Sequence, residues 1–202
     1  MFAKTTEMTA NLRLIQQGIC NGYENSLIEL YRHFHDRLQQ FSLSIVRSGE
    51  DAEEIVEDIF VKLWANRKQI LSIDNLSVYL YVTAKNRCYN LLVQRGRSVQ
   101  YSYEDMVDDM ASPSLDPHKL LVSAEMMKRM QAAVEDLPSR CKMIFRLIRE
   151  DGLQYKEVAR ILDISVNTID VQMAIATKRI CATLEQQDGD VKFLPKSSGR
   201  KK

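Results

Sequence analysis

The sequence contains few residues that break helices, with only 7 glycines and 4 prolines among 202 residues. Because glycine and proline are the weakest helix formers, this scarcity favours a mostly helical chain. Apolar residues make up 45% of the sequence, which excludes a wholly disordered protein, and the few glycines exclude a collagen-like one. The length allows one ordinary domain or two small ones.

The sequence also lacks long apolar runs. No uncharged stretch approaches the roughly 20 residues that a helix needs to span a bilayer. The first residues, MFAKTTEMTANL, have no apolar core of the kind found in signal peptides. We therefore expect a cytoplasmic protein.

Residues for catalysis or metal binding are scarce. The four cysteines, at positions 20, 88, 141 and 181, are too far apart for a C-x-x-C metal pattern, so we expect reduced packing residues. Only three histidines are present, and there is no Glu-x-x-His pair, glycine-rich phosphate loop or G-x-S-x-G motif. The sequence therefore predicts no catalytic residues, no metal, no cofactor and no small-molecule substrate, and so not an enzyme.

Apolar residues at helical spacing dominate the first half of the chain. Ser26 and Glu29 form a capping-box pattern that predicts a helix start at Ser26. Apolar side chains follow at positions 27, 30, 31, 34, 38, 41 and 45, which is one continuous helical stripe. A shorter helix is expected over residues 10–20.

Two further helices are expected before residue 97. The first begins at Asp51, because acidic residues fill its first turn, where the helix dipole favours them. Residues 66–77 are predicted to form a loop, and Ser77 to cap a helix over residues 78–95.

Helical periodicity disappears over residues 98–122, which carry five acidic residues, one basic residue and two prolines. This composition predicts a flexible acidic linker between a domain at 10–97 and a second domain at 123–187. Residues 188–202 are basic and are expected to be a disordered tail. The predicted fold is thus all-α, with two small helical domains.

The second domain is predicted to start with a helix whose apolar stripe ends at Pro138. That stripe comprises Met126, Met127, Met130, Ala133, Val134 and Leu137. Ser139 is expected to cap the next helix, and the Asp151-Gly152 pair to end it.

Residues 155–180 have the pattern of a helix-turn-helix: a helix over 155–162, a three-residue turn and a helix from Val166. Ala159 is small where the helices would cross, and Asp163 tolerates the left-handed conformation that such a turn requires. Ser165 is suited to cap the second helix. Five apolar residues are expected to pack within this unit: Val158, Leu162, Ile164, Val166 and Ile169.

The first turns of the second helix would face the major groove of DNA. The predicted base contacts are Asn167, Thr168, Asp170, Val171 and Gln172. The predicted phosphate contacts are Lys156, Arg160, Lys178 and Arg179. The stretch VNTIDVQMAIA holds no Lys or Arg, so we expect weak DNA binding by this domain alone. The alternative for this segment is a helical hairpin in a purely structural bundle.

Three segments carry a family resemblance: DAEEIVEDIFVKLW (51–64), VYLYVTAKNRCYNLL (78–92) and LQYKEVARILDISVNTIDVQMAIATKRI (153–180). In this order, and with an acidic linker between them, they resemble the extracytoplasmic-function (ECF) group of bacterial RNA polymerase sigma factors. The resemblance implies a region 2 domain at 10–97 and a region 4 domain at 123–187. It also implies a protein that binds core RNA polymerase, directs it to promoters and helps to open the DNA.

The resemblance also implies specific residues. Glu54, Glu57 and Asp58 would bind polymerase, whereas Asp51 would serve only the helix dipole and Trp64 the domain core. Contacts to the opened minus-10 element would come from Asn75, Tyr79, Lys85, Asn86 and Arg87. The region 4 helix would contact the minus-35 element. The linker would pass through the polymerase channel that nascent RNA later occupies. Its acidic residues would there mimic an RNA backbone: Glu104, Asp105, Asp108, Asp109 and Asp116.

The implied partners are core RNA polymerase, promoter DNA and a membrane-anchored anti-sigma factor. Two other hypotheses remain open at this point. One is a stand-alone helix-turn-helix regulator whose N-terminal domain senses a ligand or dimerises. The other is an all-α enzyme, which would need a buried cluster of titratable groups that the sequence does not offer.

Overall fold

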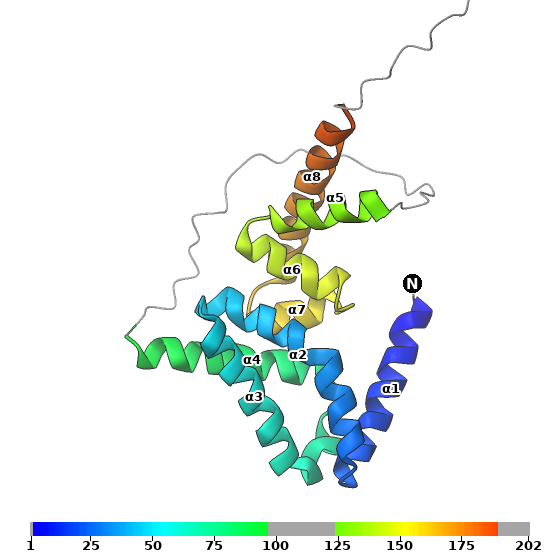
Figure 1. Ribbon diagram of the computed structural model, residues 1–202, viewed down its shortest axis with the longest axis vertical. Helices are drawn as coiled ribbons and strands as arrows, with labels where there is room; N and C mark the ends of the chain where they lie inside the picture. Colours follow the sequence, from blue (N-terminus) through cyan, green and yellow to red (C-terminus); the bar gives the residue numbers. More distant parts are fainter. Residues whose placement is uncertain (1, 97–123, 190–202) are drawn as a thin grey trace, which may run out of the picture.

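The computed structural model describes residues 2–96 and 124–189, all of them in helices or short connections (Figure 1). The first group comprises α1 (Phe2–Cys20), α2 (Glu24–Val46), α3 (Gly49–Ala65), the 3-10 helix η1 (Arg67–Ser72) and α4 (Leu76–Gln94). The second comprises α5 (Ala124–Glu135), α6 (Ser139–Arg149), α7 (Tyr155–Leu162) and α8 (Val166–Gly189). The predicted all-α, two-domain fold is confirmed, while the predicted linker and most of the predicted tail lie outside the described residues.

The N-terminal domain, α1–α4, is built around α2, which contacts α1, α3 and α4 (Figure 1). The predicted apolar stripe of α2 supplies its core, with Leu30, Phe34, Leu38 and Phe41 buried. In the described residues, no helix is long and apolar enough to span a membrane.

The predicted capping box at the start of α2 is wrong. The helix begins at Glu24, and Ser26 lies inside its first turn. Ser26 instead packs against Gly18 of α1, where a β-carbon on the glycine would come within 2.0 Å of the serine Oγ. Glu29 accepts a hydrogen bond from Asn11 Nδ2 at 3.4 Å. This serine–glutamate pair therefore marks a helix–helix contact.

The helices α3 and α4 each begin two residues before their predicted starts. Ser48 caps α3 and accepts a hydrogen bond from the Asp51 amide at 3.3 Å. Asn75 caps α4 and accepts one from the Val78 amide at 3.0 Å, so the cap is not Ser77. Between them, η1 occupies part of the predicted loop.

The C-terminal domain, α5–α8, packs α5, α6 and α7 against α8. Its core contains Ile144 and Leu147 of α6 and Ile161 of α7. Two expectations for this domain are wrong: the cap of α6 and one member of the apolar stripe of α5. Ser139 is the first residue of α6 and makes no capping bond, and Met127 is exposed on α5.

The helix-turn-helix is formed by α7, residues 163–165 and α8. Asp163 adopts the predicted left-handed conformation with φ 57°. Ser165 Oγ accepts a hydrogen bond from the Thr168 amide at 3.0 Å, which confirms it as the cap of α8. Ala159 is buried where α7 meets its neighbours, whereas Val166, expected to be buried, is exposed.

Candidate nucleic-acid interface

The outer face of α3 is acidic. Glu54, Glu57 and Asp58 are exposed, while the other side of the helix is buried in the domain core. The predicted polymerase-binding residues therefore share one accessible surface. Glu53 and Val61 lie on the same face and were not predicted. The side chain of Val61 is 66% exposed, so the face combines carboxylates with an apolar group.

The acidic side of α3 lies beside an aromatic residue of α2, Tyr31. Tyr31 stacks on His35 and contacts Phe60, with ring centroids 4.5 Å and 4.9 Å away. Burial is the main reason that the pKa of Tyr31 is raised, and the carboxylates of Glu57 and Glu53 add to the rise. We name Glu53, Glu54, Glu57, Asp58 and Val61 the acidic face.

Asp51 does not belong to the acidic face. Its carboxylate is buried and forms a two-bond pair with the guanidinium of Arg95, at 2.5 Å and 2.8 Å. The prediction that Asp51 serves only the helix dipole is therefore wrong, because it also ties the start of α3 to the end of α4. Trp64 packs against the core, as expected, and Arg67 lies 4.9 Å from the centre of its ring.

The segment that leads into α4 is held by α1. The buried side chain of Gln16 donates hydrogen bonds to the carbonyl oxygens of Ile70, at 3.0 Å, and Ile73, at 2.9 Å. Arg13 donates another to the carbonyl of Leu71 at 3.2 Å. These bonds fix the position of η1 and of the residues that follow it.

A polar stripe runs along α4 and is exposed except at the half-buried Thr83. Tyr79 and Asn86, both predicted to contact DNA, lie on it together with Thr83 and Asn90. The spacing of four, three and four residues identifies one helical side. Thr83 and Asn90 were not predicted, although the same periodicity in the sequence indicates them.

Two of the predicted minus-10 residues are engaged inside the domain. Lys85 is only 9% exposed, and its amine lies 5.7 Å from the centre of the Tyr89 ring, so contact with a base is inconsistent with its position. Arg87 donates a hydrogen bond to Asp58 at 2.7 Å. This pair connects the polar stripe of α4 with the acidic face of α3.

Asn75 uses both ends of its amide. Its oxygen caps α4, and its Nδ2 donates a hydrogen bond to Glu157 Oε1 of α7 at 2.6 Å. The other oxygen of Glu157 accepts from the backbone amide of Gln154 at 2.7 Å and so caps α7. A predicted minus-10 residue is therefore bonded to the helix-turn-helix of the other domain.

The start of α8 presents a second exposed stripe. Asn167 and Asp170 are exposed as predicted, and Val171 is half-buried beside them. Ala174 continues the same side of the helix and was not predicted; a small apolar side chain there suits contact with a thymine methyl group. Thr168 is half-buried and shares a hydrogen bond of 2.8 Å with Ser165.

Gln172 is the exception among the predicted base contacts. It is 5% exposed and follows Ile169 on the buried side of α8, where Cys141 Sγ donates to its backbone carbonyl at 3.3 Å. This burial is inconsistent with a base contact. The predicted phosphate contacts Lys156, Arg160, Lys178 and Arg179 are all exposed on α7 and α8.

Comparisons with known proteins match both domains. A family model described as Sigma-70 region 2 matches residues 30–98, and one described as Sigma-70, region 4 matches residues 127–180. The ECF RNA polymerase sigma-E factor of Escherichia coli strain K12 is 28% identical over 162 residues, which cover 77% of this chain and 82% of that protein. The chain belongs to the ECF group of sigma factors.

Other sigma factors are similar as well. The ECF RNA polymerase sigma factor SigE of Mycolicibacterium smegmatis is 21% identical over 141 residues, covering 70% of this chain and 54% of that protein. A solved structure of the sigma factor RpoE in complex with the anti-sigma factor NepR from Bartonella quintana has a TM-score of 0.49 and 24% identity, and covers 78% of this chain and 95% of that chain. A structure of CnrH in complex with the cytosolic domain of CnrY has a TM-score of 0.48 and 17% identity, with 86% and 97% covered.

Within this sigma factor, the acidic face and the polar stripe of α4 lie in the part that matches region 2. The exposed stripe of α8 lies in the part that matches region 4. Each part therefore carries its own exposed surface.

Proposed function

We propose that this sigma factor uses three separate surfaces in transcription initiation. The acidic face of α3 binds core RNA polymerase, the polar stripe of α4 captures unpaired promoter bases, and the first turns of α8 bind the duplex minus-35 element. The observation that carries the proposal is the placement of these surfaces on different exposed helix sides.

The acidic face is suited to a basic protein partner. Exposed carboxylates steer association and pair with Arg and Lys at a contact surface. Val61 adds an apolar group that loses contact with water when a partner covers it.

The stripe on α4 is suited to single-stranded DNA. Unpaired bases bind to proteins by stacking on aromatic rings and by hydrogen bonds to their edges. Tyr79 offers a half-exposed ring, and Asn86 and Asn90 offer exposed amides. No cation is needed for these contacts, so the burial of Lys85 is compatible with the proposal.

The protein acts where polymerase and promoter DNA are, which is the cytoplasm. Sigma factors are initiation factors, and this chain carries out no chemical reaction of its own. A membrane-anchored anti-sigma factor is the expected inhibitor. By covering the acidic face it would block the approach of polymerase.

Run-off transcription tests the function directly. Core polymerase and a set of promoter fragments are incubated with and without the purified chain, and the transcripts are measured. We expect new transcripts that start at a defined site only when the chain is present. Tight binding to duplex DNA without core enzyme, together with no transcript, would instead indicate a stand-alone regulator.

The acidic face is tested by a triple variant, Glu54→Gln, Glu57→Gln and Asp58→Asn. We expect its affinity for core polymerase to fall about tenfold or more, because charges at a protein contact contribute to both rate and affinity. The matched control changes three exposed acids elsewhere, Glu24→Gln, Asp36→Asn and Asp136→Asn. Equal affinities of the two triple variants would overturn the assignment.

A further inference from the structure

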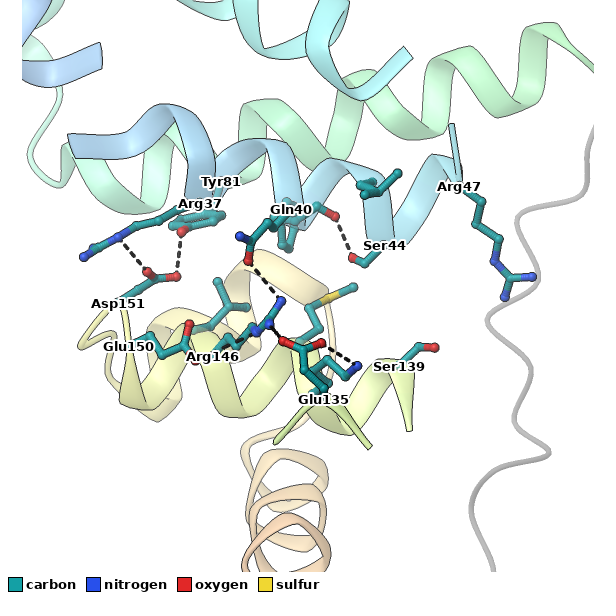
Figure 2. A pocket seen from close by; sticks show the side chains of 15 residues that line it. Arg37, Gln40, Ser44, Arg47, Tyr81, Glu135, Ser139, Arg146, Glu150 and Asp151 are labelled. Carbon is teal, nitrogen blue, oxygen red and sulfur yellow. Dashed lines mark hydrogen bonds and ion pairs between the residues drawn. The ribbon is translucent and has the colours of Figure 1, made fainter. Parts of the chain in front are cut away.

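Carboxylates with a structural role in this chain have donors close by. Asp151, at the end of α6, accepts a hydrogen bond from Tyr81 Oη of α4 at 2.6 Å, and its other oxygen lies 3.3 Å from Nε of Arg37 on α2 (Figure 2). Asp51 is paired with the guanidinium of Arg95 in a similar way. Such partners offset the cost of holding a negative charge away from water. An acid without them is therefore not explained by packing.

Asp170 on α8 is an acid of this second kind. Its side chain is exposed, and among the residues that the structure describes no hydrogen bond or ion pair engages it. The exposed stripe of α8 places it beside Asn167, Val171 and Ala174, at the spacing of one helical side. The first cation of α8 is Lys178, about 12 Å further along the helix axis. At that separation salt screens most of the attraction between two exposed charges.

An acid in the exposed stripe of α8 opposes DNA binding unless a base compensates it. Duplex DNA carries one negative charge per about 1.7 Å of its axis, so the phosphates repel Asp170 when the stripe enters the groove. The stripe also lacks the arginine or lysine that binds the O6 and N7 acceptors of guanine. A carboxylate at this place therefore requires an amino group on the base that it faces.

The major groove presents such an amino group on cytosine. The N4 amino group of cytosine is a donor that a carboxylate accepts, whereas guanine and thymine present acceptor oxygens that repel it. Adenine presents an amino group beside the N7 acceptor, a pair that suits the amide of Asn167 better than a carboxylate. The small aliphatic side chains of Val171 and Ala174 are suited to the methyl group of thymine.

We propose that Asp170 selects the minus-35 element of this sigma factor by accepting a hydrogen bond from a cytosine amino group. Thymine methyl groups beside that cytosine contact Val171 and Ala174, and guanine is excluded at the position that faces Asp170. The acid lowers the affinity for duplex DNA in general and raises the discrimination between sequences. This inference rests on the minus-35 role proposed above for α8, because it names the bases that α8 reads there.

Transcription from a promoter library tests the base preference. The upstream duplex of a promoter that the chain transcribes is randomised, and barcoded run-off transcripts are counted. We expect cytosine to be enriched about tenfold or more at one position, as for a good base contact, and guanine to be depleted there. In Asp170→Asn the preference at that position should move to adenine, which an amide binds through N6 and N7. An unchanged preference would contradict the inference and leave the sigma function intact, whereas no transcript from any template would contradict the sigma function itself.

A second selection is independent of polymerase. The full chain is incubated with a random duplex library at low salt, where weak DNA binding becomes measurable. Asp170→Asn should bind random duplex several-fold more tightly than the unmodified chain, yet it should no longer enrich cytosine. The matched control is Glu185→Gln, which removes an exposed acid about 22 Å further along α8 and should change neither property. Equal effects of the two variants would mean that net charge controls binding, and the inference would fail.

The thymine contacts are tested through a single methyl group. Replacement of a thymine in the selected element by deoxyuridine removes the methyl group and keeps the hydrogen bonds of the base pair. We expect affinity to fall about three- to fourfold for the thymines that face the stripe, the usual effect of one buried methyl group. Thymines outside the element serve as the control. No loss at any thymine of the element would remove Val171 and Ala174 from the inference, and the preference at Asp170 would stand alone.

Discussion

Single side chains in this sigma factor carry more than one contact, and Asn75 shows this most clearly. Its oxygen satisfies the first turn of α4, while its amide nitrogen bonds to the other domain. The two functions can be separated by chemistry, because aspartate keeps a capping oxygen but has no donor.

We expect Asn75→Ala to lower the free energy of unfolding by about 1 kcal/mol, the usual cost of a lost cap. Asn75→Asp, combined with Glu157→Gln so that two carboxylates do not face each other, should retain most of that stability. Both variants should lose binding to a single-stranded minus-10 oligonucleotide in the presence of polymerase. Urea unfolding and a fluorescence binding assay measure the two effects, and equal stability of the alanine and aspartate variants would contradict the cap.

The cysteines offer a test of burial at the same scale. Burial raises the pKa of both Cys88 and Cys141 to about 11. Only about one thiol in a thousand would then be ionised at pH 8, and the thiolate is the reactive form. An unfolded chain ionises its thiols near pH 9, whereas the folded chain keeps these two protonated. The free energy of unfolding should therefore fall as the pH rises from about 9 to about 11.

We therefore expect iodoacetamide at pH 8 to modify the half-buried Cys20 and Cys181 well before Cys88 and Cys141. Mass spectrometry of the native protein over time measures the order. In denaturant all four should react at similar rates, which is the control. Early modification of Cys141 in the native protein would mean that the packing of α6 against α8 is looser than described.

At the scale of whole elements, the helices were predictable and their boundaries and partners less so. The apolar stripe of α2 and the turn at Asp163 follow from local spacing and backbone preference, and both are present. Asn75 and Ser77 are both good caps, and local sequence does not decide between them. Gln172 is polar but lies on the buried side of α8, because tertiary packing fixes which side is covered.

The side-chain contacts that join one helix to another could not be predicted from the sequence. The bonds of Gln16 to η1 and of Tyr81 to Asp151 connect residues 54 to 70 positions apart along the chain. Neither pair has a periodicity or motif that indicates it. Such contacts depend on how the helices pack, which a single sequence does not show.

The bonds between Gln16 and η1 lead to a prediction for that element. Gln16→Leu leaves two carbonyl oxygens without their donor, which should cost about 1–3 kcal/mol of stability. The segment before Asn75 should then move, and promoter opening should fall while polymerase affinity stays unchanged. Gln17→Leu is the matched control, since Gln17 is the exposed neighbour. Permanganate footprinting of unpaired thymines on a promoter measures the opening.

For the whole molecule, the distribution of charge between the domains says more about its binding partners than the net charge does. The formal net charge is +1, yet the acidic face and the cations of the helix-turn-helix lie in different domains. Opposite charges on the two domains suit a protein that binds a basic partner with one domain and DNA with the other. Glu157 of α7 also lies against Asn75, so a carboxylate stands beside a residue predicted to contact DNA and weakens the electrostatic attraction of DNA there.

This arrangement predicts weak, moderately salt-dependent binding of the free chain to duplex DNA. Four exposed cations, Lys156, Arg160, Lys178 and Arg179, would give a slope of log affinity against log salt no steeper than about −4. Lys156→Ala should flatten that slope by about one unit without changing sequence preference. Fluorescence anisotropy across a salt series measures the slope. A much steeper slope would mean that other basic residues bind DNA, and the requirement for polymerase to hold the C-terminal domain on the promoter would lose its electrostatic basis.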